Sequence, residues 1–234
     1  MSALPETTVA AAAPSAYVRR RATGTPKPLL IAGIRALGRG LARVVFRLEV
    51  TGQAHVPPSG AVLLAGNHSG LLDGPLVFFF SPRAPVLLAK AEIFVGPWAR
   101  WFGWLGQVPV HRGRSDRAAL QAGLAQLAAG GPLAVFPEGS RGTGRLDEVT
   151  DGLAFLALRS GAPVVPVAVT GTALALPKGS WWPKLRTPVR IAFGAPLALE
   201  VAGDRRARST VRVAAEQLRL ALVHHLRTVE AAAR

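Results

Sequence analysis

The chain has 234 residues, half of them hydrophobic, and a formal net charge of +15, which fits one domain with a buried core. Cysteine is absent, which excludes disulfides, thiolate metal sites and a cysteine nucleophile. The positive charge attracts nucleic acid, anionic lipid and phosphorylated substrates alike, but no run of like charge exceeds three residues, which excludes a polybasic nucleic-acid tail.

The first 27 residues are rich in alanine and small polar residues. A secretory signal begins with a basic segment ahead of an apolar one, and residues 1–18 contain no basic residue, so no such signal is expected. We predict a disordered tail over 1–27.

A helix is predicted at 29–48, with arginines four residues apart. They are Arg35, Arg39, Arg43 and Arg47. Side chains at this spacing advance about 40° per step and form a stripe beside an apolar face. Arginines are costly at mid-membrane, so the segment should not span a bilayer. Two interpretations stay open: an interfacial helix on anionic lipid, or an ordinary amphipathic helix with its arginines in water.

Strands and helices then alternate, which predicts an α/β domain with a mixed, mainly parallel sheet flanked by helices. Strands are predicted at 46–52, 61–65, 85–89, 107–111, 133–136, 164–170 and 189–193. Helices are predicted at 75–80, 96–105, 116–129, 152–159 and 210–232.

The first motif, at 67–73, follows the predicted strand 61–65 and places His68 five residues before Asp73. On a regular helix this separation turns through about 140°, so the side chains can meet only in a strand-to-helix turn, which Gly70 favours. A base held by a carboxylate can take a proton from an alcohol. In the alternative interpretation Asp73 caps a helix that begins at Gly74, and His68 is a polar residue at the strand end.

The second motif is the segment 136–141, again at the end of an apolar strand. Gly139 allows close backbone approach, and Arg141 offers a fork of donors, which suits a phosphate. Glu138 can orient a basic group or accept a substrate hydroxyl. The alternative is a solvated turn. A Walker loop is excluded, because Arg145 and Leu146 stand where lysine and serine or threonine belong.

The two motifs together, in this order and about seventy residues apart, resemble those of the glycerolipid acyltransferases, the family of 1-acylglycerol-3-phosphate acyltransferases. Segments 103–112 and 164–171 resemble the family's two other blocks, so the resemblance covers about 61–171.

The resemblance implies transfer of a fatty acyl group to the free hydroxyl of 1-acylglycerol 3-phosphate, giving phosphatidate. His68 would act as the general base and Asp73 would orient it. The residues implied to hold the phosphate are Arg112, Glu138, Gly139, Arg141 and Lys90. No metal or cofactor is implied, and acyl-CoA or acyl carrier protein would serve as co-substrate. The alternatives are another lysolipid acceptor and a non-catalytic membrane-binding module.

For this family we expect a lipid substrate, an anionic membrane surface and acyl carrier protein as partners, and no nucleic acid. The expected location is peripheral, on the cytoplasmic face of the cell membrane. Trp181 and Trp182, close to Lys184 and Arg186, suit the headgroup level of a bilayer. The expected divisions are an interfacial helix with a lead-in strand at 28–60, an acyltransferase domain at 61–200, and a C-terminal helix at 201–234 packed on that domain.

Overall fold

The computed structural model of the chain describes residues 28–90, 105, 107–110, 116–138, 144–146, 150–197, 199, 201 and 203–232. The predicted tail at 1–27 and residues 96–104 of the predicted helix 96–105 lie outside these described residues.

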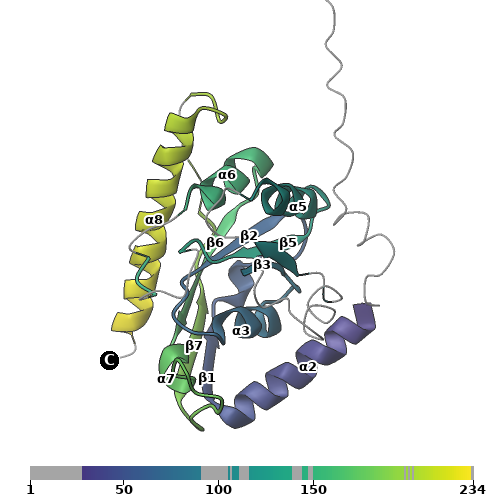
Figure 1. The fold of residues 1–234 in the computed structure, drawn as a ribbon, viewed down its shortest axis with the longest axis vertical. Helices are drawn as coiled ribbons and strands as arrows, with labels where there is room; N and C mark the ends of the chain where they lie inside the picture. Colours follow the sequence, from purple (N-terminus) through teal and green to yellow (C-terminus); the bar gives the residue numbers. More distant parts are fainter. Residues whose placement is uncertain are drawn as a thin grey trace, which may run out of the picture.

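One seven-stranded sheet, in the order β1-β7-β6-β2-β5-β3-β4, forms the centre of the described structure (Figure 1). The strands are β1 (Arg47–Thr51), β2 (Val62–Gly66), β3 (Val86–Lys90), β4 (Val108–Val110), β5 (Pro132–Val135), β6 (Val164–Thr170) and β7 (Pro188–Phe193). Strands β6, β2, β5, β3 and β4 are mutually parallel, whereas β7 pairs antiparallel to β6 and parallel to β1. The mixed, mainly parallel sheet is therefore confirmed, and every predicted strand lies within one residue of its expected bounds.

Helices cover both faces of this sheet (Figure 1). On one face lie α5 (Arg117–Ala128), α6 (Asp151–Ser160) and α8 (Arg208–Ala231), and on the other lie α2 (Pro28–Val45) and α3 (Asp73–Phe80). Two short elements were not predicted from the sequence: η1 (Gln53–His55) and α7 (Thr172–Ala175).

The central strand β2 is buried on both faces, as its unbroken apolar run predicts. Val62 and Leu64 join the core beneath α2 and α3, while Leu63 and Ala65 join the core beneath α5, α6 and α8. The residues that follow β2 are thus attached to a strand that is buried along its whole length.

Helix α2 packs on the domain with one of its arginines turned inward. Arg35 is only 8% exposed and turns inward, where its Nε donates to the Phe78 carbonyl at 2.9 Å and its Nη2 donates to the Ser81 carbonyl. It therefore satisfies carbonyl groups at the C-terminal end of α3, which a helix leaves without internal partners. The outward side is apolar and consists of Leu29, Leu30, Leu37, Leu41 and Val44.

This orientation corrects the prediction in two respects. The continuous arginine stripe is wrong, because Arg35 is buried and Arg47 belongs to β1 after the helix has ended at Val45. The interpretation in which the arginines face water and the leucines face the core is also wrong, since Leu37 is 76% exposed.

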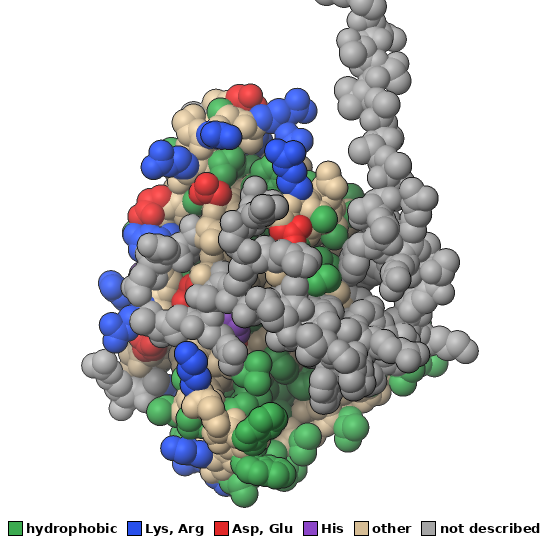
Figure 2. Space-filling model, in the orientation of Figure 1, with side chains coloured by type: hydrophobic (Ala, Val, Ile, Leu, Met, Phe, Trp, Pro, Cys, Tyr) green, Lys and Arg blue, Asp and Glu red, His purple; other side chains and the backbone are tan. Residues whose placement is uncertain are grey.

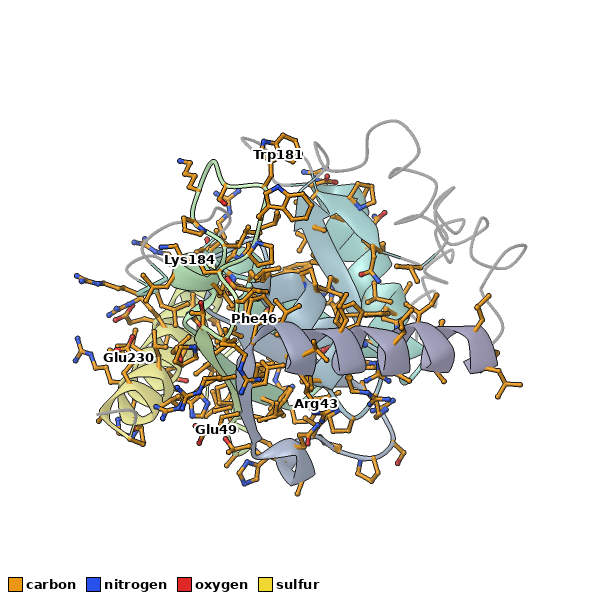
Figure 3. The ribbon with its side chains drawn as sticks, turned by 90° about the horizontal axis from the view of Figure 1, so that it is seen from below. Arg43, Phe46, Glu49, Trp181, Lys184 and Glu230 are labelled. Atoms are coloured by element: carbon orange, nitrogen blue, oxygen red, sulfur yellow. The ribbon has the colours of Figure 1, made fainter. Side chains whose placement is uncertain are left out.

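A second exposed apolar segment follows α7. Trp181 is 92% exposed, and Trp182 and Leu185 are exposed beside it. Figure 2 shows hydrophobic side chains gathered over the end of the molecule where α7 and α2 lie. Seen from below in Figure 3, α2 crosses this end with Trp181 on one side and Arg43 on the other. Within the described residues, no helix combines the length and the apolarity needed to cross a bilayer.

Candidate active site

Three neighbouring strands deliver polar residues to one edge of the sheet. His68 follows the carboxyl end of β2, Glu138 follows that of β5, and Thr172 follows that of β6. The carboxyl ends of parallel strands are where α/β proteins bind ligands. Gly171, at φ 85°, reverses the chain between β6 and α7, a conformation that favours glycine.

His68 and Asp73 meet in the turn between β2 and α3. The His68 Nδ1 lies 3.0 Å from the Asp73 Oδ2, and the His68 side chain is 19% exposed while that of Asp73 is fully buried. The predicted meeting of the two side chains is confirmed. The ring's other nitrogen, Nε2, has no hydrogen-bond partner within the described part of the chain, so it can accept a proton from a bound group.

The Asp73 carboxylate accepts three further hydrogen bonds. The backbone N–H groups of Ser69 and Gly70 each donate to Oδ2 at 2.8 Å, and the Thr172 hydroxyl donates to Oδ1 at 2.5 Å. The capping interpretation is wrong, because α3 begins at Asp73 itself and the carboxylate is directed at the preceding loop instead of the helix amides. Gly70 is required here, since a Cβ at this position would approach the Thr172 Oγ1 to 2.8 Å.

Two residues that fix this turn were missed from the sequence. Thr172 is fully buried and also lies 3.1 Å from the Ser69 Oγ. The Asn67 side-chain amide pairs with both backbone groups of Val169, donating to its carbonyl at 2.9 Å and accepting from its N–H at 2.8 Å. The Asn67 side chain thus extends the hydrogen bonding between β2 and β6 beyond the last backbone pair, and it fixes the start of the turn.

On its other side, His68 contacts residues that follow β5. Its ring packs on that of Phe136 with centroids 4.9 Å apart, and its backbone N–H donates to the Glu138 Oε1 at 2.9 Å. Burial raises the pKa of Glu138, while the hydrogen bonds from the backbone N–H groups of His68 and Gly144 oppose this shift. Glu138 therefore fixes the backbone of the histidine in the described structure.

The structure says little about the other predicted site residues. Lys90 ends β3 at the same sheet edge, but its side chain lies outside the described part of the chain. Arg112, Gly139 and Arg141 also lie outside the described residues. Their roles at a phosphate stay predictions.

A histidine held by a buried carboxylate, at the carboxyl edge of a mainly parallel sheet, is an arrangement that suits general-base catalysis on a hydroxyl group. The family model described as Acyltransferase matches residues 47–170, which is more than half of the chain. The chain therefore belongs to the acyltransferase family, and the resemblance seen in the sequence is confirmed.

Similar proteins carry a consistent name. Over 162 residues the chain is 30% identical to a 1-acyl-sn-glycerol-3-phosphate acyltransferase of Limnanthes alba, covering 64% of this chain and 54% of that protein. Over 154 residues it is 32% identical to the enzyme of the same name in Pseudomonas aeruginosa, covering 62% of this chain and 55% of that protein. The chain spans about half the length of the curated relatives it matches.

The fold is also similar to a solved one. The crystal structure of the 1-acyl-sn-glycerophosphate acyltransferase PlsC from Thermotoga maritima matches with a TM-score of 0.62 at 24% sequence identity. The match covers 86% of this chain and 80% of that one, so the two share a fold.

Proposed function

We propose that this protein transfers a fatty acyl group from a thioester to the free hydroxyl of 1-acylglycerol 3-phosphate, giving phosphatidate. The observation that carries the proposal is the His68–Asp73 pair, 3.0 Å apart, in a chain that belongs to the acyltransferase family. The names of the relatives support the choice of acceptor.

In this mechanism the acceptor hydroxyl donates its proton to the Nε2 of His68 while its oxygen attacks the thioester carbonyl. Asp73 holds the Nδ1 and stabilises the imidazolium that forms. The tetrahedral intermediate then expels the thiolate, which takes the proton back from His68, so the ester and the free thiol leave together. A base of this kind contributes about 10²–10⁴-fold in rate.

The substrate phosphate would be held by Arg112, Arg141, Gly139 and Lys90, as the family resemblance implies. Glu138 has the same sign of charge as a phosphate and accepts the His68 N–H. We therefore assign it to holding the histidine backbone instead of contacting the phosphate directly. The thioester donor is acyl-CoA or acyl carrier protein, and no metal or cofactor takes part.

The acceptor is a lipid, so the enzyme must work at a membrane surface. The exposed leucines of α2 and the exposed Trp181 support docking on a bilayer, because such residues gain free energy when they leave water. The net charge of +15 favours an anionic membrane surface. We place the protein peripherally on the cytoplasmic face of the cell membrane, without a nucleic-acid partner.

Release of free thiol from palmitoyl-CoA, measured with a panel of lysolipids, tests this function. The wild type should release thiol with 1-acylglycerol 3-phosphate, and His68→Ala should lower the rate about 10²–10⁴-fold. His224→Ala is the matched control, since His224 is exposed on α8 and should leave the rate unchanged. The panel is repeated with acyl carrier protein as donor.

Equal turnover by His68→Ala and the wild type would contradict the mechanism. Thiol release with a different lysolipid would keep the chemistry and replace the acceptor. Absence of turnover with both donors, together with intact vesicle binding, would instead favour a non-catalytic membrane-binding module.

A further inference from the structure

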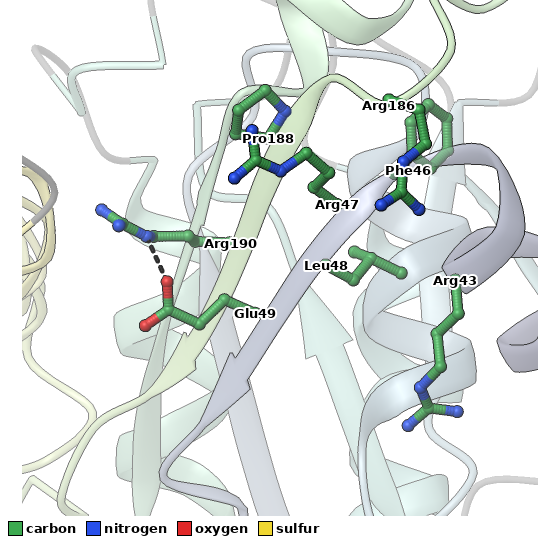
Figure 4. Close-up of a pocket in the computed structure, with 8 residues that line it drawn as sticks. All are labelled: Arg43, Phe46, Arg47, Leu48, Glu49, Arg186, Pro188 and Arg190. Atoms are coloured by element: carbon green, nitrogen blue, oxygen red, sulfur yellow. Dashed lines mark hydrogen bonds and ion pairs between the residues drawn. The ribbon is translucent and has the colours of Figure 1, made fainter.

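An open pocket of about 490 Å³ lies where α2 ends and where β1 and β7 begin (Figure 4). The pocket is lined by four arginines, one carboxylate and three apolar side chains. The lining residues are Arg43, Phe46, Arg47, Leu48, Glu49, Arg186, Pro188 and Arg190.

The charges of this pocket are not balanced within it. Glu49 is its one acidic lining residue and pairs with Arg190 at 2.5 Å. Arg43 lies over the ring of Phe80, 5.1 Å from its centroid, which does not neutralise it. Within the described residues, the side chains of Arg47 and Arg186 form neither an ion pair nor a hydrogen bond. The arginines that line this pocket carry like charge, and a bound anion would offset part of that charge.

The backbone around the pocket is held in an unusual conformation. Arg186 has a φ of 57°, a left-handed value that is uncommon for a residue other than glycine. Its N–H donates to the Val45 carbonyl at 2.6 Å, and the N–H of Arg47 donates to the Thr187 carbonyl at 3.0 Å. These two bonds place both arginines beside the end of α2 at the expense of local strain, which proteins commonly retain at functional sites.

The pocket lies at the same edge of the sheet as the His68 site but apart from it. Because β1 and β7 run opposite to β6, their starts lie at the edge where β6 and β2 end, and Arg190 pairs in register with Thr170. β1 is three strands from β2 in the sheet order, which corresponds to roughly 14 Å at the usual strand spacing. No residue that lines the pocket contacts His68 or Asp73 through a hydrogen bond in the described structure.

The pocket also lies at the border of the exposed apolar side of α2. Arg43 follows the exposed Leu41 and precedes the exposed Val44, about 100° from Val44 around the helix. When the leucines enter the acyl region of a bilayer, arginines at this border reach the level of the phosphates.

We propose that the arginine pocket binds the phosphate of an anionic bilayer phospholipid that is not the acyl acceptor. Arg47 and Arg186 donate to the phosphate oxygens, and Arg43 stands at the rim. Together with the leucines of α2, this contact sets the orientation of the protein on the membrane, with the His68 edge toward the lipid. The proposal rests on the membrane location given under the proposed function.

Sedimentation of the full chain with vesicles tests the proposal without any turnover. The vesicles contain phosphatidylcholine alone or phosphatidylcholine with a minor fraction of phosphatidate. The test variant is Arg47→Gln/Arg186→Gln. The control is Arg208→Gln/Arg212→Gln, which removes the same charge from exposed positions at the start of α8, at the end of the molecule away from α2 (Figure 1). Circular dichroism checks that both variants are folded.

The test variant should bind phosphatidate-containing vesicles about 25-fold more weakly than the wild type. Each arginine near an anionic surface contributes about fivefold to the binding constant, and the variant removes two. The control should change this binding less than about twofold, because its charges lie more than a Debye length from the bilayer. Binding to vesicles of phosphatidylcholine alone should be the same for all three proteins.

Equal weakening by the two variants would overturn the proposal in favour of diffuse attraction by net charge. Unchanged vesicle binding by the test variant would also overturn it. If the test variant then showed a raised KM for acyl-CoA, the pocket would belong to the phosphates of the donor. The vesicle-binding outcomes do not depend on the role of His68, which the thiol-release assay tests separately.

Discussion

The turn around Asp73 and the arginine pocket lie at the same edge of the sheet, and each concentrates charge of one sign. The fully buried Asp73 carboxylate receives four hydrogen bonds, all from groups of the protein itself. The pocket holds four arginines at its surface and supplies one carboxylate for them. The Asp73 carboxylate thus has all its partners within the protein, whereas Arg47 and Arg186 have no ion partner among the described residues.

This difference separates two uses of charged residues. A general base must be oriented before the substrate arrives, so the groups around Asp73 are fixed by internal hydrogen bonds. A surface that recognises an external anion must leave its donors available. Arg35 resembles the groups around Asp73, although it lies on α2, because its guanidinium donates hydrogen bonds to carbonyl groups at the end of α3.

The largest expected effect on folding comes from breaking an internal contact of an arginine. Arg35→Met should lower the free energy of unfolding by about 2–3 kcal/mol, because the carbonyls of Phe78 and Ser81 lose a charged donor. Arg47 is exposed and lines the arginine pocket, so Arg47→Met should change the free energy of unfolding by less than about 0.5 kcal/mol. Urea denaturation measures both values. Equal losses of unfolding free energy in the two variants would contradict the distinction between the buried Arg35 and the exposed Arg47.

A smaller effect, on turnover, is expected from the Thr172 hydroxyl. Thr172→Val keeps the shape of the side chain but removes the donor to the Asp73 Oδ1, so kcat should fall about tenfold with little change in KM. Thr172→Ser keeps the hydroxyl and should restore most of the rate. Steady-state kinetics with both variants would contradict a positioning role if valine and serine gave the same kcat.

The smallest effect concerns the pH dependence of stability at Glu138. Burial raises its pKa, so the folded state favours the protonated carboxyl. The stability that this group contributes is present below its ordinary pKa and is lost as the pH rises through the raised value. Glu138→Gln stays neutral and keeps an oxygen for the His68 N–H.

The unfolding free energy of the wild type should therefore fall relative to Glu138→Gln as the pH rises above about 4, the ordinary pKa of a glutamate. The change should stay below about 1 kcal/mol, because the half-buried group is partly screened by solvent. A difference that grows in the opposite direction would show that the hydrogen bonds to Glu138 outweigh its burial.

Local spacing in the sequence showed how His68 and Asp73 could meet, and the family resemblance favoured that interpretation over helix capping. The two residues are five positions apart with Gly70 between them, and they directly follow an apolar strand, so few arrangements other than a tight turn can bring their side chains together. The strands were predictable for a similar reason, since the runs of β2 and β6 are apolar throughout and end at polar or glycine residues.

The contacts that complete the site were not predictable, because their partners are distant in the chain. Thr172 lies 99 residues after Asp73, and Asn67 lies 102 residues before Val169. The orientation of α2 was left open by the sequence. Helical periodicity shows which residues share a face, but it does not show which face packs on the domain, and the carbonyl groups that bind Arg35 belong to another helix.

The four donors to Asp73 also set an order of events during folding. Three of them come from residues three to five positions earlier in the chain, and can assemble as soon as the turn forms. The fourth comes from Thr172 and requires that β6 pair with β2 and that Gly171 reverse the chain. The histidine and its carboxylate can therefore meet early, but the carboxylate is fully held only after Thr172, 99 residues further along the chain, has been made and β6 has paired with β2.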